Sequence, residues 1–127
     1  MKFLARLAPV FLSMLRIAAA FTFVEHGTQK LFAFPVGSRV AVASLMGLAG
    51  MLETAGGALV LLGAFTRPVA FVLAGEMAYA YFTVHAPQGR WPIQNQGELA
   101  VVYCFLWLYF SAAGAGPISV DRALRRA

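Results

Sequence analysis

Four apolar stretches, each about long enough to cross a lipid bilayer, constrain the fold of this chain more than any other feature. An α-helix needs about 20 mainly apolar residues to cross the hydrocarbon core. Only 12% of the residues are charged and 61% are hydrophobic, whereas soluble domains carry about 25% charged residues. The sequence therefore predicts an all-α, four-helix transmembrane bundle that forms one domain over residues 1–127. The predicted spans are approximately residues 7–26, 41–63, 68–84 and 97–113.

The basic residues predict the orientation of the bundle and do not indicate a nucleic-acid partner. The net charge is +5, but the ten Lys and Arg residues are scattered over both ends and every loop. Nucleic-acid binding is instead typical of basic residues gathered in a stripe. With four spans, six cations share the end that holds the termini, so both termini are predicted to be cytoplasmic. The two groups are Lys2, Arg6, Arg67, Arg122, Arg125 and Arg126 against Lys30, Arg39 and Arg90.

The N-terminus imitates a signal peptide, because Lys2 and Arg6 precede an apolar run that ends in alanines at 18–20. Arg16 interrupts this run, which favours an uncleaved first span. The single cysteine, Cys104, allows no internal disulfide, no CxxC redox pair and no thiolate metal site.

Charged residues inside the apolar stretches are the first candidates for function. A charged side chain at the bilayer centre costs about 2.5–3.5 kcal/mol on insertion scales, so such residues are expected to be paired or functional. We expect Arg16, Glu53 and Glu76 near mid-depth, with Arg16 neutralising one acid. Burial and a like charge then favour the protonated form of the other acid, so the two acids would share a proton. These three residues are candidates for proton handling; the alternative is a structural Arg–Glu clamp.

The neighbours of the two acids suggest how each is accommodated. Glu53 is flanked at three and four residues by small residues, which let another helix pack closely, so Glu53 is predicted to face inward. Tyr79 and Thr83 share a helix face with Glu76 and are its predicted hydrogen-bond partners. The small residues are Ala49, Gly50, Gly56 and Gly57.

Polar residues near the predicted outer surface suggest a binding site. His26 and Lys30 in the first span and His85 in the third could hydrogen-bond the two carbonyls of a quinone head group. Quinone reduction takes up two protons with two electrons, so nearby carboxyl groups such as those of Glu25 and Glu98 are chemically suited to donate protons to the quinone. Alternatively, the histidines are interfacial and are satisfied by water and loop carbonyls. Neither histidine has a second ligand at metal-binding spacing in its helix, so no metal site is predicted.

Motifs over nearly the whole chain carry a resemblance to a known family. They are EHGTQKLF (25–32), GMLETAGGALVLLGAFTR (50–67), GELAVVY (97–103) and GAGPISVDRAL (114–124). With them the sequence resembles the DoxX family of small four-helix membrane proteins. The family's polar pattern falls on Arg16, His26, Gly27, Lys30, Glu53, Gly56, Gly57, Glu76, His85, Glu98, Gly116, Ser119 and Asp121.

The resemblance implies a multi-pass protein of the prokaryotic plasma (inner) membrane. Some members are similar to a subunit of a thiosulfate:quinone oxidoreductase, and others are linked to quinone detoxification or oxidative stress. We therefore expect an oxidoreductase component that binds a quinone, contacts membrane lipid, works with a soluble redox partner protein and forms a homo-oligomer. Two alternatives stay open: a small-molecule permease or proton-coupled exporter, and a membrane scaffold that docks a soluble enzyme through the basic tail, residues 122–127.

Overall fold

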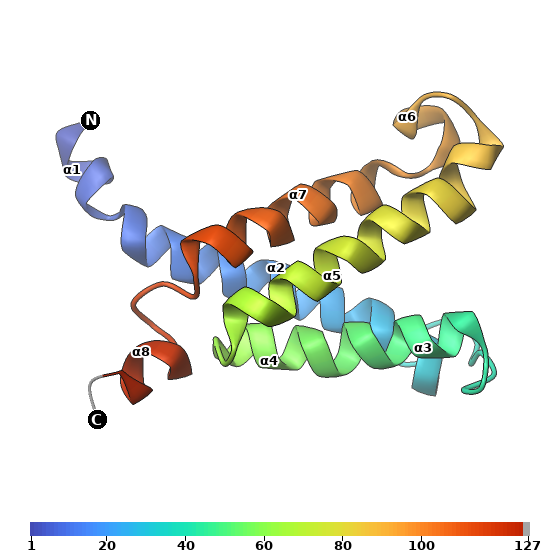
Figure 1. Ribbon diagram of the computed structural model, residues 1–127, viewed down its shortest axis with the longest axis horizontal. Helices are drawn as coiled ribbons and strands as arrows, with labels where there is room; N and C mark the ends of the chain where they lie inside the picture. The colour runs from blue at the N-terminus through green and yellow to red at the C-terminus, as the bar shows by residue number, and fades with distance from the viewer. Residues whose placement is uncertain (126–127) are drawn as a thin grey trace.

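The computed structural model describes residues 1–125, and all regular secondary structure in this part of the chain is helical. Four long helical segments alternate in direction, so that residue 1 and the last helix lie at the same end of the bundle (Figure 1). The first segment is α2 (Ala8–Phe32), which follows the short helix α1 (Lys2–Arg6). The last segment is α7 (Glu98–Ala113), and the short helix α8 (Val120–Leu124) follows it.

The two middle segments each contain a π-helical turn. The second segment runs continuously through α3 (Leu45–Met51), the π-helical η1 (Leu52–Gly56) and α4 (Gly57–Leu62). The third comprises α5 (Thr66–Ala80) and the π-helical η2 (Tyr81–His85). A π-helical turn contains an extra residue, rotates the following side chains about the helix and is frequent at functional sites.

The loop between the third and fourth segments is more regular than the sequence predicts. Residues 85–96 contain two prolines and one glycine and have no periodicity, which predicts an irregular loop, but they include the 3₁₀ turn η3 (Ala86–Gln88) and the helical turn α6 (Pro92–Asn95). Each turn has a proline at its first or second position. Proline is favoured there because its fixed φ angle suits a helix start and its missing N–H is not needed.

The segments pack as two hairpins. In one hairpin α2 contacts α3, η1 and α4, and in the other α5 contacts α7. The hairpins lie close together near the turn between α4 and α5 and diverge toward α3 and α6 (Figure 1).

An aromatic cluster joins the two hairpins near the middle of the bundle. The ring of Phe23 in α2 lies 5.0 Å from that of Tyr103 and 5.2 Å from that of Trp107, both in α7. These edge-to-face contacts each contribute about 0.5–1.5 kcal/mol beyond area burial. The hydroxyls of Thr22 and Tyr103 share a hydrogen bond of 2.6 Å beside the cluster. The core therefore fixes α2 against α7 as well as against the second segment.

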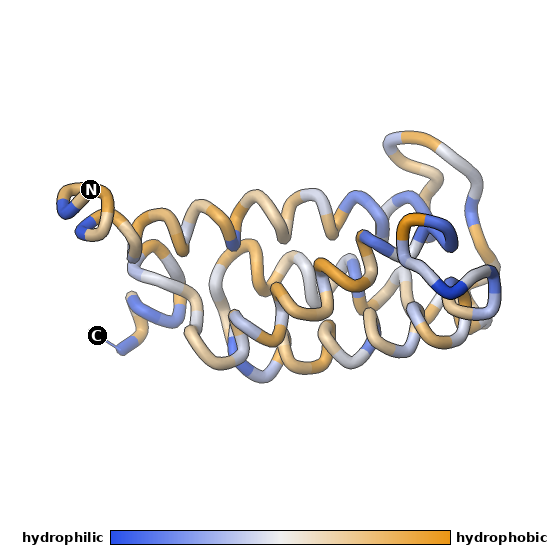
Figure 2. The backbone as a smooth tube through the Cα atoms, turned by 90° about the horizontal axis from the view of Figure 1, so that it is seen from above, coloured by the Kyte–Doolittle hydropathy of each residue, from blue (hydrophilic) through white to orange (hydrophobic). Residues whose placement is uncertain are grey.

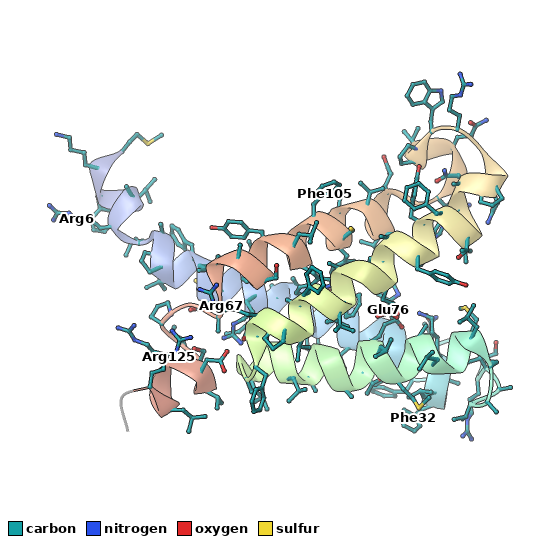
Figure 3. All side chains as sticks on the ribbon, viewed as in Figure 1. Arg6, Phe32, Arg67, Glu76, Phe105 and Arg125 are labelled. Atoms are coloured by element: carbon teal, nitrogen blue, oxygen red, sulfur yellow. The ribbon has the colours of Figure 1, made fainter. Side chains whose placement is uncertain are left out.

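The outer surface of the bundle is apolar. Phe105 is 67% exposed and Phe71 is 65% exposed, and Phe105 extends away from the bundle in Figure 3. Hydrophilic residues gather toward the two ends of the molecule, whereas apolar residues dominate the helices between them (Figure 2). In the described part of the chain, three segments are long and apolar enough to cross a membrane: Ala8–Phe32, Leu45–Leu62 and Thr66–Gln88. The apolar helix Glu98–Ala113 is shorter, at 16 residues.

Candidate functional site

A buried ion pair links the first two helical segments. Lys30 lies in the last turn of α2, and its Nζ donates hydrogen bonds to both carboxylate oxygens of Glu53 in η1. The side chain of Glu53 is 4% exposed and that of Lys30 is 19% exposed. Removing both charges from water is costly, and only close contact with full hydrogen bonding offsets that cost. The bidentate contact supplies this compensation.

Glycines let the two helices approach closely enough for this pair to form. A Cβ atom on Gly27 of α2 would overlap the backbone of Thr54, and one on Gly50 of α3 would lie 3.1 Å from the side chain of Lys30. Small residues permit such backbone contact between membrane helices. Lys30 lies almost one turn beyond Gly27, so its side chain reaches Glu53. The inward orientation of Glu53 that the sequence predicts agrees with its burial.

Glu76 of α5 adds a second acid to this region. Both of its carboxyl oxygens are buried, and neither has a hydrogen-bond partner among the described residues. Glu76 lies close enough to Glu53 and Lys30 to interact electrostatically. Figure 3 shows it on the side of α5 that faces the second segment. Nearly all buried polar groups in proteins are hydrogen-bonded, so this exception needs an explanation. We call Lys30, Glu53 and Glu76 the acid–lysine cluster.

The predicted hydrogen-bond partners of Glu76 are wrong. The side chain of Tyr79 is 54% exposed, and the hydroxyl of Thr83 donates to the backbone carbonyl of Tyr79 at 2.7 Å. Threonine in a helix commonly bonds to the carbonyl four residues earlier, which uses its only donor. The carboxyl group of Glu76 is therefore left to face the other two members of the cluster.

The predicted pairing of Arg16 with one of these acids is also wrong. Arg16 is 1% exposed, and its guanidinium donates to four backbone carbonyls. Two carbonyls belong to the last turn of α4, where a helix lacks internal donors, and two belong to the loop after α7. The planar guanidinium carries five N–H donors and can serve several such acceptors at once. The carbonyls are those of Val60, Leu61, Ala115 and Ile118.

The C-terminal motif (114–124), which supplies two of the carbonyls bound by Arg16, also contacts the start of α5. The carboxylate of Asp121 accepts hydrogen bonds from the backbone amides of Phe65 (2.8 Å) and Thr66 (3.0 Å). The start of α5 is thus capped by a residue far away in the chain. Partial burial alone would raise the pKa of Asp121, but the amides of Thr66 and Phe65 and the charge of Arg125 lower it overall.

The three residues predicted to contact a quinone head group are not brought together. His26 is half-buried on α2 and lies close enough to Glu53 to interact electrostatically. His85 belongs to the other hairpin, where its Nδ1 and the carbonyl oxygen of Asn95 are 3.1 Å apart. The α6 turn that contains Asn95 lies on one diverging branch of the bundle, and the end of α2 lies on the other (Figure 1). His26 and Lys30 therefore share a region without His85.

The two remaining acids stand outside the cluster. Glu98 is exposed and opens α7, where a helix N-terminus favours an acid. Glu25 is half-buried on α2, and among residues 1–125 neither carboxylate forms an ion pair. Within the same residues, no three His, Cys, Asp or Glu side chains gather as a metal-binding group.

Sequence reasoning missed two polar contacts that organise the structure. It placed Lys30 and Glu53 at different depths, although glycines close to each residue could have indicated that their helices approach. It did not single out Asn95, which is 1% exposed and bonds to the carbonyl of Gly89 and the amide of Gly97. Asn95 lies in a loop without periodicity, so no pattern distinguishes it.

Comparison with known proteins agrees with the motifs. The sequence model of the DoxX family matches residues 11–86, which include all three members of the acid–lysine cluster. A protein of Haemophilus influenzae described as an uncharacterized protein is 47% identical over 125 residues, which cover 93% of each chain. No solved structure matches the chain.

Proposed function

Because the chain belongs to the DoxX family of membrane proteins, we propose that it is the quinone-binding, proton-handling membrane component of an oxidoreductase system in the prokaryotic plasma membrane. The site is the acid–lysine cluster, with His26 beside it. The observation that carries the proposal is the carboxyl group of Glu76, buried without a hydrogen-bond partner next to a buried ion pair. A buried polar group of this kind is costly for folding alone and is suited to a ligand or a transferred proton.

We further propose that all four long segments cross the membrane, with both termini in the cytoplasm. The 16 residues of α7 span about 24 Å, less than the usual hydrocarbon thickness of about 30 Å. Local thinning of the bilayer accommodates such a mismatch at modest cost. The charge distribution supports the orientation, because described cations are more numerous at the end that holds α1 and α8.

The residues of the cluster fit the chemistry of a quinone. A quinone carbonyl needs hydrogen-bond donors; Lys30 has three N–H bonds, of which two are directed to Glu53, and protonated Glu76 has an O–H. Reduction of a quinone to a hydroquinone consumes two electrons and two protons. In this proposal protonated Glu76 supplies one proton, and the ammonium group of Lys30, paired with the Glu53 carboxylate, supplies the other. The electrons must come from a partner protein with its own redox cofactor, since the chain has one cysteine and no CxxC pair.

Mass spectrometry of lipid-soluble compounds that co-purify with the protein in detergent tests this proposal. We expect about one quinone per protein in the wild type and at least a tenfold loss in Glu76→Leu and Lys30→Ala, because the first removes an O–H donor and the second a charged N–H donor. Glu98→Leu is the matched control, since it also removes an acid but from an exposed position. Equal quinone content in all variants, or none in the wild type, would overturn the proposal. Proton uptake into vesicles that requires Glu76 without bound quinone would favour the exporter.

A further inference from the structure

A cavity at the other end of the bundle holds a second group of charges. Its volume is about 400 Å³, and its walls come from the start of α2, the turn between α4 and α5, the loop after α7, and α8. Among residues 1–125, three arginines and a single acid line it. The arginines are Arg67, Arg122 and Arg125, and the acid is Asp121. The lining is therefore positively charged and selects for an anion.

Part of each arginine remains available to such an anion. One Nη atom of Arg67 donates to the carbonyl of Ala112 at 2.6 Å, while its Nε and other Nη lie beside Gly114, where there is no side chain. Among the described residues, the guanidinium groups of Arg122 and Arg125 have no hydrogen-bond acceptor, and both side chains are exposed. The amides at the start of α5 are already bound by Asp121, so the arginines are the available donors.

The cavity lies where the apolar helices end, which is the level of lipid head groups. Its wall also includes apolar residues, among them Pro9, Leu12 and Phe65, and Phe65 is 66% exposed. Arg67 and Arg125 both lie at this end of the molecule (Figure 3). An apolar wall beside a group of arginines is complementary to a lipid, which joins acyl chains to a phosphate.

We propose that this cavity binds the phosphate group of an anionic phospholipid. The planar guanidinium forms paired hydrogen bonds with phosphate oxygens. Basic residues next to membrane helices attract anionic lipids for the same reason. A zwitterionic lipid carries an ammonium group that the three arginines disfavour, so a phosphatidylglycerol-type head group fits better than phosphatidylcholine. The bound lipid would join α8 to the ends of α5 and α7.

Native mass spectrometry of the full chain in mild detergent, with added phosphatidylglycerol or phosphatidylcholine, tests the assignment. We expect one tightly bound phosphatidylglycerol and at least tenfold weaker phosphatidylcholine binding. Each arginine near a charged membrane surface contributes on the order of fivefold in affinity, so Arg122→Gln with Arg125→Gln should weaken phosphatidylglycerol binding about 25-fold. Arg67→Gln alone also removes the bond to Ala112, so the double variant is the more direct test.

Two further measurements can overturn the proposal. The control variant Lys2→Gln with Arg6→Gln removes two charges from α1, which does not line the cavity, and it should change phosphatidylglycerol affinity less than twofold. An equal loss in this control would show a general surface-charge effect. Thermal unfolding with inorganic phosphate separates the lipid from a free anion: equal stabilisation by phosphate and phosphatidylglycerol would exclude the lipid. Unchanged lipid affinity in the double arginine variant would overturn the proposal.

Discussion

Toward its two ends α2 carries a buried cation, Arg16, and a half-buried cation, Lys30, and the two are satisfied in different ways. Arg16, toward the start of the helix, directs its donors to four backbone carbonyls. Lys30, in the last turn, is bound to one carboxylate, and a second carboxylate nearby has no partner among the described residues. Both regions lie inside an apolar bundle, so the polarity of the surroundings does not explain why the two cations have different partners.

This contrast separates structural charge from functional charge. The contacts of Arg16 join α2 to the end of α4 and to the loop after α7, and they are complete without any other molecule. In the acid–lysine cluster, Glu53 lies in the π-helical turn η1, and the carboxyl oxygens of Glu76 in α5 have no hydrogen-bond partner among the described residues. A purely structural clamp does not need an acid whose oxygens have no hydrogen-bond partner in the part of the chain that the structure describes. If the two kinds of charge differ in this way, substitutions in the two regions change stability and ligand binding differently.

The largest loss of stability is expected from Arg16→Met. The substitution removes the Arg16 donor from four carbonyls, of which only that of Val60 keeps another donor, the amide of Gly63 at 2.9 Å, among the described residues. Each unsatisfied buried group costs about 1–3 kcal/mol. We expect destabilisation by more than about 3 kcal/mol and loss of the folded bundle in detergent, measured by thermal unfolding. Arg39→Met is the matched control, because Arg39 is exposed and its Nε bonds to a single carbonyl, that of Leu31. A similar loss in both variants would contradict the structural role of Arg16.

A smaller loss is expected when the ion pair is broken on one side. Lys30→Met leaves the carboxylate of Glu53 buried without a counter-charge, which costs about 3 kcal/mol in comparable pairs. The double variant Lys30→Met with Glu53→Leu removes the second charge as well and should recover most of that loss. A double-mutant cycle on unfolding free energies measures this coupling. Additive losses would show that the two side chains do not depend on each other.

The sequence is sufficient to predict the helices but not the partners of the buried charges. Helix positions follow from long apolar stretches, since length and hydropathy are local properties. The acceptors of Arg16 depend on where α4 ends and on how the chain folds back after α7. One of them, the carbonyl of Ala115, lies 99 positions away in the sequence. Carbonyls are present at every residue, so no side-chain pattern identifies these acceptors. The pairing of Lys30 with Glu53 can be predicted from the sequence, because glycines near each residue indicate a close contact between their helices.

An intermediate effect with a defined pH dependence is expected for Asp121→Ala. The substitution removes the carboxylate that caps α5, and loss of a cap costs about 0.5–2 kcal/mol. The pKa of Asp121 is lowered below its ordinary value of 3.8, so its contribution is complete above that value and is lost as the pH falls through the folded-state pKa. Melting curves should therefore separate wild type and variant at neutral pH and converge in acid. A difference that persists in strong acid would mean that the carboxylate charge is not responsible.

The smallest effect on stability, and the one of opposite sign, is expected for Glu76→Leu. Leucine has a similar size and removes a buried carboxyl group whose oxygens have no hydrogen-bond partner within residues 1–125, so the substitution should stabilise the bundle by about 1 kcal/mol. The same variant should lose bound quinone, because leucine has no hydrogen-bond donor for a quinone carbonyl. Thermal unfolding and quinone content, measured on the same preparation, test both parts. Destabilisation comparable to that of Arg16→Met would place Glu76 with the structural charges and remove the contrast between the two ends of α2.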